Sequence, residues 1–285
     1  MARPAGVTIR EMTTNDVAAG LSLCRAAGWN QRESDWLHFL NAAPHGALVA
    51  EERGAVIGTV ATLPYGPFTW ISMVLVAPAA RGGGVGTTLL QRGLELVPTG
   101  VVPRLDATPA GEVLYRKLGF AGEYGLERWF LDRNQAPPRA GRAARPIEPS
   151  DWPAIREMDH RTFGAPRIDL LQRLAVEAPE YAWVLEGDRG LRGYLFGRHG
   201  HVREHLGPMV AGDDESARLL LASCLAAVPA RAVFMDVPGH QQAFRTYLLD
   251  AGFVVERPFL RMYRGALTTP GEPPLIFAIA GPEFG

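Results

Sequence analysis

The chain has 285 residues, which is long for a single hydrophobic core and favours two domains. Its 29 basic and 30 acidic side chains leave a formal charge of −1, so no global field attracts nucleic acid or an anionic membrane. The two cysteines, Cys24 and Cys224, fall in different halves, and no apolar run has the length of a signal peptide or a spanning helix, so we expect a cytoplasmic protein without a structural disulfide.

Signals for helices and strands follow one another in the first part of the chain. Asp16 can cap a helix that runs through Arg25, and Ser34 can cap a second helix through Leu40. The next segments are rich in β-branched and aromatic residues, which is typical of strands. The predicted strands are 47–51, 55–62 and 69–76.

The third predicted strand leads into Pro78 and a run of glycines. A helix is predicted at 87–97 because its apolar positions recur at helical spacing. A strand at 103–107 then precedes a helix that ends at Leu118-Gly119. These elements indicate a mixed α/β layer whose central strand feeds a glycine turn and a helix.

Two sequence segments of the first half recur in the second half. The segment ending at Asp16 resembles the segment ending at Asp151, 135 residues later, and the segment ending at Phe120 resembles the one ending at Phe253, 133 residues later. Two nearly equal offsets indicate a duplicated domain. A stretch of Pro, Gly, Ala and Arg between the copies is typical of a linker. We expect a first domain at 1–134, a linker at 135–146 and a second domain at 147–285.

The most specific segment lies between the predicted central strand and the following helix. It reads Val76-Ala-Pro78, then Arg81-Gly-Gly-Gly84-Val-Gly86. Glycines let the backbone approach a ligand closely, and a helix N-terminus presents unpaired N–H groups. The ligand we expect at such a segment is therefore a phosphate. The segment has neither the Gly-Lys-Ser/Thr ending of a nucleoside triphosphate loop nor the Gly-x-Gly-x-x-Gly spacing of a dinucleotide site.

Arg81-x-x-Gly84-x-Gly86 resembles the pyrophosphate-binding signature of the Gcn5-related N-acetyltransferase (GNAT) superfamily. Further on, residues 107–120 resemble the family's second motif, a helix that carries a tyrosine and ends in Leu-Gly-Phe. The resemblance covers about residues 9–131. It implies an α/β (α+β) fold with two tandem domains, each a mixed, largely antiparallel sheet flanked by helices. It also implies acetyl-CoA (coenzyme A) as the cofactor.

The resemblance further implies the roles of individual residues. Backbone amides from Gly82 to Gly86 would hold the pyrophosphate, and the central strand would hold the pantetheine arm and offer an N–H that polarises the thioester carbonyl. Tyr115 would protonate the departing thiolate as the general acid. The cofactor-binding residues implied in this way are Val74, Leu75, Val76, Arg81, Gly82, Gly83, Gly84, Val85, Gly86 and Thr87.

The general base is left open by the sequence. Many members of the family carry a glutamate on the central strand near the position held here by Met73, and methionine cannot accept a proton. Ordered water that drains protons to solvent is one alternative. The other candidates are Glu33, Asp35, His38, His45 and Asp106, for each of which surface charge or helix capping is an alternative role.

The second copy departs from the family pattern. Its segment Gly212-Asp-Asp-Glu215 replaces the arginine and the glycines, and three carboxylates at a helix N-terminus would repel a pyrophosphate. Leu248 stands where Tyr115 stands in the first copy, with Tyr247 next to it. This half resembles the C-terminal domain of bacterial tandem acetyltransferases of the YitH-like group. We expect a degenerate domain without a cofactor site.

Two uses of the second domain remain open at this stage. It could cover an apolar edge of the first sheet, or it could form a wall of the acceptor pocket with residues 163–167 and 206–211. The closing segment 274–280 predicts a last strand that could pair with either sheet. The histidines between His199 and His205 lack the flanking ligands of a closed site, so we expect no metal.

The sequence therefore predicts an acetyl-CoA-dependent N-acetyltransferase that acts on a primary amine. The near-neutral charge favours a small-molecule acceptor over a polycationic one, and we expect a monomer or a homodimer. The alternative is a non-catalytic CoA- or acyl-CoA-binding regulatory protein of the same fold. Met73 at the glutamate position favours that alternative, and Tyr115 favours the enzyme.

Overall fold

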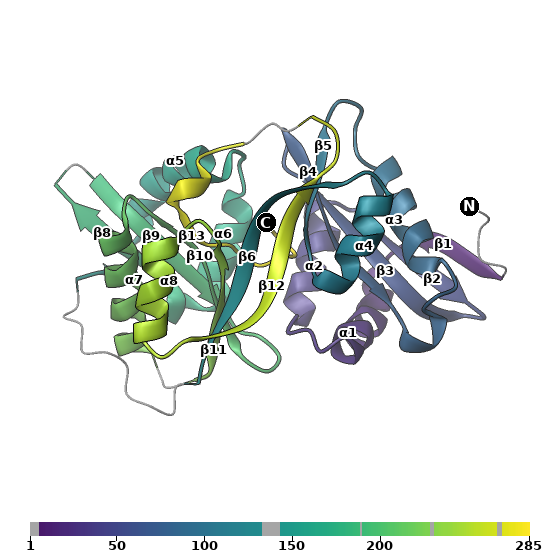
Figure 1. Ribbon diagram of the computed structural model, residues 1–285, viewed down its shortest axis with the longest axis horizontal. Coiled ribbons are helices and arrows are strands. Elements are labelled where there is room, and N and C mark those ends of the chain that lie inside the picture. The colour runs from purple at the N-terminus through teal and green to yellow at the C-terminus, as the bar shows by residue number, and fades with distance from the viewer. Residues whose placement is uncertain (1–5, 133–142, 189, 229–230, 267–269) are drawn as a thin grey trace.

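The computed structural model describes residues 6–132, 143–188, 190–228, 231–266 and 270–285. Figure 1 shows two lobes, one from each half of the chain, with two long strands side by side between them. The sheet is continuous through both lobes, and most of its neighbouring strands are antiparallel. The fold is therefore mixed α/β, as the sequence predicted.

The described residues of the first half form six strands and four α-helices. The strands are β1 (Val7–Glu11), β2 (Ala47–Glu52), β3 (Ala55–Pro64), β4 (Phe68–Val76), β5 (Val102–Ala107) and β6 (Ala121–Leu131). The helices are α1 (Val17–Ala26), α2 (Glu33–Ala42), α3 (Val85–Glu95) and α4 (Pro109–Lys117). The predicted strands and helices are confirmed to within a few residues.

Neither predicted side-chain cap forms: Asp16 occupies the N-cap position of α1 without a side-chain cap hydrogen bond, and Ser34 does not occupy the N-cap position of α2. α2 begins at Glu33, so Ser34 lies inside the helix, and its hydroxyl donates to Glu177 of the second half instead. Arg32 occupies the capping position, and its backbone N–H donates to the Asp35 carboxylate at 2.9 Å. The acidic residue in the first turn therefore satisfies the end of the helix, as in a capping box.

The second half repeats this order of elements. Its strands are β7 (Arg145–Pro146), β8 (Trp183–Gly187), β9 (Gly190–Arg198), β10 (Glu204–Ala211), β11 (Val233–Pro238), β12 (Val254–Tyr263) and β13 (Ile276–Ala278). Its helices are α5 (Trp152–Phe163), α6 (Ile168–Glu177), α7 (Asp214–Ala227) and α8 (Gln242–Asp250). β13 has no counterpart among the elements described in the first half.

An identical ion-pair motif stands at the start of both copies. In the first, the Arg10 guanidinium donates to both oxygens of Asp16 at 2.8 Å and also pairs with Glu51. In the second, the Arg145 guanidinium donates to both oxygens of Asp151, at 2.8 and 2.9 Å, and also pairs with Glu186. All three positions are offset by 135 residues, which is the repeat that the sequence indicated.

The two halves exchange their last long strands. β5 pairs with β12, where Ala107 lies opposite Leu260, and β11 pairs with β6, where Val233 lies opposite Leu131. β6 and β12 also pair with each other, which joins both sheets in the order β1-β2-β3-β4-β5-β12-β6-β11-β10-β9-β8-β7. Each lobe therefore needs a strand from the other half to complete its sheet.

This exchange bears on the predicted domain division. β6 precedes the predicted linker in sequence and pairs with strands that follow it. Part of that linker, residues 133–142, lies outside the described residues. The domain boundaries at 134 and 147 remain a proposal about the repeat in the sequence, not about two structurally separate domains.

The core extends through both halves. α1 and α2 cover one face of the first sheet, and Phe39 of α2 stacks on Phe284 at a ring-centroid distance of 5.3 Å. Tyr65 lies edge-on to Phe163 of α5 at 4.9 Å within the same cluster of buried residues. On the opposite face, α3 packs its buried leucines on β2, β3 and β4. Burial of shared apolar surface therefore holds the lobes together.

The repeated ion pair yields a prediction for stability and its pH dependence. Arg10 beside Asp16 holds the pKa of that carboxyl well below its usual range. A lowered folded-state pKa stabilises the fold above the unfolded value of about 3.9, and this contribution fades as the pH falls below it. We expect Asp16→Asn to destabilise the protein by about 1–2 kcal/mol at pH 7, discounted for the partly exposed Arg10.

Thermal melting of the wild type and of Asp16→Asn at pH 7 and pH 3 checks this expectation. The difference in melting temperature should be a few degrees at pH 7 and smaller at pH 3. Glu95→Gln, which removes an exposed pair with Arg92, serves as the control and should change little at either pH. An equal difference at both pH values would contradict the assigned role of Asp16.

Candidate active site

The central parallel strands β4 and β5 separate after a short paired stretch. Their register covers only Phe68 to Trp70 against Val102 to Arg104. Beyond it, β4 carries a bulge, because Met73 and Val74 together face the single position between Thr59 and Ala61 of β3. The split leaves a cleft of about 900 Å³ between the strands.

The bulge holds a strained residue in place. Met73 has a φ of +54°, a value that non-glycine residues rarely adopt, and its side chain is buried. The Thr59 hydroxyl donates to the Met73 carbonyl at 2.7 Å, which fixes the bulge from the neighbouring strand. The backbone after Met73 is thereby turned out of the ladder toward the cleft.

A glycine cradle lies at one end of the cleft. Gly82 and Gly84 have φ values of +80° and +83°, and a Cβ built on either would enter open space. Gly84 caps α3, whose first-turn N–H groups lack partners within the helix. Gly86 faces Val76, where a Cβ would come to 3.3 Å from a methyl group. Glycines therefore keep this helix N-terminus accessible to an anion.

Tyr115 projects from α4 into the same cleft. Gly111, one turn earlier, makes room for it, because a Cβ there would come to 2.9 Å from the Tyr115 ring. The ring packs edge-on against Phe120 at a centroid distance of 6.0 Å. Burial raises the pKa of Tyr115 to about 12, so the phenol stays protonated at neutral pH.

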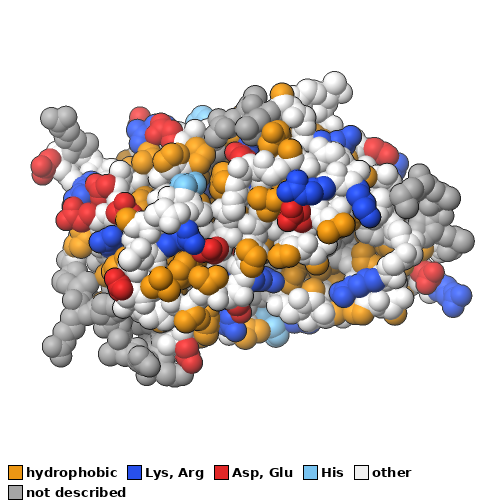
Figure 2. Space-filling view, in the orientation of Figure 1, with side chains coloured by type: hydrophobic (Ala, Val, Ile, Leu, Met, Phe, Trp, Pro, Cys, Tyr) orange, Lys and Arg blue, Asp and Glu red, His pale blue; other side chains and the backbone are white. Residues whose placement is uncertain are grey.

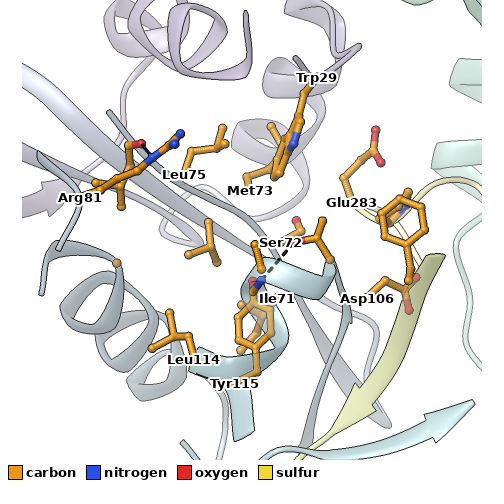
Figure 3. Close-up of a pocket in the computed structure, with 18 of the residues that line it drawn as sticks. Trp29, Ile71, Ser72, Met73, Leu75, Arg81, Asp106, Leu114, Tyr115 and Glu283 are labelled. Atoms are coloured by element: carbon orange, nitrogen blue, oxygen red, sulfur yellow. Dashed lines mark hydrogen bonds between the residues drawn. The ribbon is translucent and has the colours of Figure 1, made fainter. Parts of the chain in front are cut away.

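The structure brings Tyr115 and all the predicted cofactor-binding residues into this one cleft. Figure 3 shows Arg81 and Glu283 at opposite ends of the view, with Met73 between them, and Tyr115 and Leu114 on a helix below. Arg81 donates from Nε to the Val76 carbonyl at 3.1 Å, which leaves the rest of its guanidinium beside the cradle. The predicted residues in the lining are Val74, Leu75, Val76, Arg81, Gly82, Gly83, Gly84, Val85, Gly86, Thr87 and Tyr115.

Of the five candidate bases, Asp106 alone is in the cleft lining. Both of its oxygens accept hydrogen bonds at 2.9 Å from Arg261, so it holds that arginine rather than a substrate proton. Asp35 is buried against Arg198 and Arg173. Burial lowers the pKa of His38 to about 4.

The other two candidates are on the surface. Glu33 is exposed at the start of α2, and His45 pairs with Glu11 at 3.0 Å where both side chains are exposed. The sequence alone could not have distinguished among the five candidate bases, because a lone acidic or histidine residue carries no local pattern.

Six functional candidates were missed by the sequence reasoning, and all lie on the wall opposite the cradle. Glu283 follows β13 and is 4% exposed. Its Oε1 accepts a hydrogen bond from Gln31 at 2.9 Å and pairs closely with Arg198. No local sequence pattern could have identified these six candidates, because they come together only through the exchange of β6 and β12 and through the closing segment. The six residues are Arg128, Arg198, Phe234, Arg257, Phe259 and Glu283.

Residues 163–167 and 206–211, which were one alternative for a pocket wall, do not line the cleft. Arg167 is buried away from the cleft and pairs with Asp159 at 2.9 Å. Residues 206–211 belong to β10, which is buried along its whole length, and are not a loop. The second half does wall the cleft, but with β9, β11, β12 and the closing segment.

The second copy has the corresponding helix N-terminus, but its own side chain caps it. The Asp213 carboxylate accepts from the Ser216 N–H at 2.7 Å and also pairs with Arg192. This aspartate cap satisfies one of the helix N-terminal N–H groups, whereas the first copy has no side-chain cap at the corresponding helix. A second anion at this helix would meet the carboxylates of Asp213, Asp214 and Glu215.

The split in the second sheet is also filled. β10 and β11 pair only at Glu204–His205 against Val233–Phe234 before they separate. β13 enters this split and pairs with β10, with Ala278 opposite Met209, while the Ile279 N–H donates to the Asp236 carbonyl of β11 at 3.0 Å. The predicted last strand therefore pairs with the second half of the sheet, in the place that corresponds to the open cleft of the first.

Among the residues that the structure describes, no helix is both long and apolar enough to cross a membrane. In the segment 199–205, His199 pairs with Glu204 at 2.7 Å, and His205 is buried beside Arg198. Burial and two nearby guanidinium groups hold the pKa of His205 well below its usual range.

Known proteins resemble the chain over both halves. Two family models, each described as an acetyltransferase (GNAT) domain, match residues 43–121 and 155–278. The uncharacterised N-acetyltransferase YitH of Bacillus subtilis (strain 168) is 23% identical over 238 residues, which cover 83% of this chain and 84% of YitH.

Solved structures share the whole fold. A putative acetyltransferase from Pyrococcus horikoshii superposes with a TM-score of 0.82 at 22% identity and covers 100% of this chain and 98% of its own. A Gcn5-related N-acetyltransferase from Sphaerobacter thermophilus gives 0.70 at 19% identity, with 95% and 100% covered. The protein thus belongs to the GNAT superfamily of acyl-transferring enzymes and carries its domain twice in tandem, in a YitH-like arrangement.

Proposed function

We propose that the protein transfers the acetyl group of acetyl-CoA to the primary amine of a small-molecule acceptor, with Tyr115 as the general acid. The observation that carries this proposal is the convergence of three features on one cleft of about 900 Å³: the cradle, the bulge and the tyrosine. Acetyl-CoA supplies the acetyl group as an activated thioester. The chain's own residues bind it, polarise it and assist its leaving group.

The cradle fits a pyrophosphate. Gly82 and Gly84 leave the α3 N-terminus open, and backbone N–H groups there stabilise negative charge without a side-chain cap. Arg81 adds a guanidinium at the same end of the cleft. Residues 74–76 of β4, separated from β5, offer backbone groups to an extended arm in the manner of a strand pairing with an edge.

The bulge can supply a hydrogen-bond donor for the carbonyl oxygen of the thioester. An N–H that leaves the ladder at Val74 can donate to an oxygen on which negative charge develops, and its position is fixed before the reaction by the Thr59 hydrogen bond to Met73. Tyr115 donates its hydroxyl proton to the sulfur. Because its pKa of about 12 makes it a weak acid, much of its effect is the hydrogen bond to the developing thiolate.

A small acceptor is supported by the enclosure of the site and by the surface charge. Residues of both halves wall the cleft, and in Figure 2 basic and acidic side chains both occur across the visible face. The formal charge of −1 gives a polycationic acceptor no general attraction. We therefore propose that a small amine reaches the thioester from the side walled by the second half.

The first test addresses the cradle. Gly84→Glu places a carboxylate at the α3 N-terminus, so the dissociation constant for acetyl-CoA should rise by roughly 10-fold or more. Gly54→Glu is the matched control, because Gly54 has a similar φ of +79° and open surroundings but lies in the β2–β3 turn. Calorimetry measures the dissociation constant for acetyl-CoA in both variants. Equal values would show that the cradle does not bind the cofactor.

The second test addresses the acid. Tyr115→Phe keeps the ring and removes the proton donor, so acetyl-CoA affinity should persist while turnover falls by about 10²- to 10⁴-fold. Tyr247→Phe on α8 is the control, since it makes the same change at the neighbouring position in the second copy. If the wild type binds acetyl-CoA but releases no CoA thiol with any amine of a broad screen, the protein is the non-catalytic binder.

The third test counts cofactor sites. We expect one equivalent of acetyl-CoA per chain, because the second copy has Asp213 at the corresponding helix and β13 in the corresponding split. Titration calorimetry with the intact chain measures this number directly. Two equivalents would show that β13 can be displaced and that the second copy is not degenerate.

A further inference from the structure

The end of the cleft opposite the cradle is lined by charged groups, most of which already have partners. Arg128 donates to both oxygens of Asp236 at 2.8 Å, and the two side chains are almost completely buried. Asp106 and Arg261 form a second bidentate pair. These two pairs are balanced, so neither leaves charge for a ligand.

The carboxylates around Glu283 exceed the guanidinium groups that hold them. Arg198 pairs with both Asp35 and Glu283, and Arg173 pairs with Asp35 and Glu177. Three carboxylates therefore share two arginines. Glu283 uses Oε1 for Arg198 and Gln31, and within the described part of the chain no hydrogen bond engages its Oε2. One negative charge is left in excess beside the cleft.

Arg257 provides the matching excess positive charge. It stacks over Phe259 at 4.9 Å, it lines the cleft, and it makes no ion pair with the residues described. Its sequence neighbour Glu256 is held by Arg203 at 2.7 Å instead. The Nε of Arg257 is buried without a hydrogen-bond partner in the described residues. A partly buried guanidinium without a partner is costly, which indicates that a ligand supplies one.

Three other buried polar atoms of cleft-lining residues also lack a hydrogen-bond partner in the described structure. They are the Ser72 hydroxyl beside the bulge, Oε1 of Gln31 beside Glu283, and Nε of Arg198. Figure 3 shows Ser72 near the middle of the cleft and Glu283 toward the end away from Arg81. A polar ligand bound at this end could form hydrogen bonds with the Glu283 carboxylate, the Arg257 guanidinium and these buried atoms together.

We propose that the acceptor is an amine that also carries a carboxylate, with the carboxylate held by Arg257 and the amine oriented by Oε2 of Glu283. This inference rests on the proposed function and names its substrate class. A planar guanidinium matches a carboxylate through two parallel hydrogen bonds. The excess charges of the cleft are of opposite sign and are not paired with each other, as the two ends of an amino-acid-like zwitterion require.

The transfer is balanced with these residues. The ammonium first loses one proton to water while Glu283 accepts a hydrogen bond from the nitrogen. The neutral nitrogen then forms a bond to the thioester carbonyl carbon, and the carbon–sulfur bond breaks with its electron pair on sulfur. The sulfur takes a proton from Tyr115, and the tyrosine is reprotonated from the nitrogen, so the products are an amide and the CoA thiol.

The experiment compares amines that differ only in the carboxylate. L-Phenylalanine is tested against 2-phenylethylamine, L-leucine against 3-methylbutylamine, and β-alanine against both n-propylamine and 2-aminoethyl phosphate. Release of CoA thiol is measured with the full chain. In the pairs that turn over, kcat/KM should favour the carboxylate by roughly 10- to 100-fold, the range of one charge-assisted contact.

Variants assign this preference to residues. Arg257→Gln should reduce it to about 3-fold or less while acetyl-CoA affinity, measured by calorimetry, stays within about 2-fold and shows that the variant is folded. Arg203→Gln, which removes an arginine outside the cleft lining, should keep the preference. Glu283→Gln should lower kcat/KM for every amine, whereas Glu256→Gln should not.

Three outcomes would overturn the inference, and each differs from a failure of the proposed function. Equal rates with and without the carboxylate would leave an acetyltransferase of another specificity. A preference for 2-aminoethyl phosphate would assign Arg257 to a phosphate, and weaker acetyl-CoA binding in Arg257→Gln would assign it to the cofactor. Binding of acetyl-CoA without turnover of any amine would refute the proposed function itself, and this inference with it.

Discussion

β12 pairs with β5 along the edge of β5 that faces away from β4, and Arg261 of β12 fixes this pairing with two hydrogen bonds to Asp106 of β5. The same strand carries Arg257 and Phe259 into the cleft. β6, exchanged in the opposite direction, carries Arg128. The side of the cleft proposed for the acceptor therefore depends on a strand pairing between residues more than a hundred positions apart, and separating the halves would remove it.

The two copies solve the same structural problem in different ways. In each, two central parallel strands separate and leave backbone groups without ladder partners. Buried backbone groups must find partners, so the split has to be filled. In the second copy β13 fills it, and Asp213 caps the adjacent helix. In the first copy both positions stay open, which is the arrangement expected where a ligand supplies the missing groups.

Strain in the first copy is concentrated where the chemistry is proposed. Met73 lies in the left-handed region at φ +54°, which costs of order 1–3 kcal/mol in a non-glycine residue. The Thr59 hydroxyl and complete burial of the side chain stabilise the bulge against this cost. A preformed bulge needs no rearrangement when charge develops on a bound carbonyl, and this is the advantage of a fixed hydrogen-bond donor over water. Rigidity of β3 and β4 thus contributes directly to the proposed catalysis.

The sequence by itself determined the features that are local in the chain. The cradle from Arg81 to Gly86, the helix that carries Tyr115 and the 135-residue repeat are contiguous patterns, so glycine spacing, helical period and recurrence predict them. The tertiary structure alone decided the exchange of β6 and β12, because both strands have similar patterns and either could have completed either sheet. It alone brought Glu283 and Arg257 to the cleft, since their placement follows from long-range strand pairing, which no local pattern encodes.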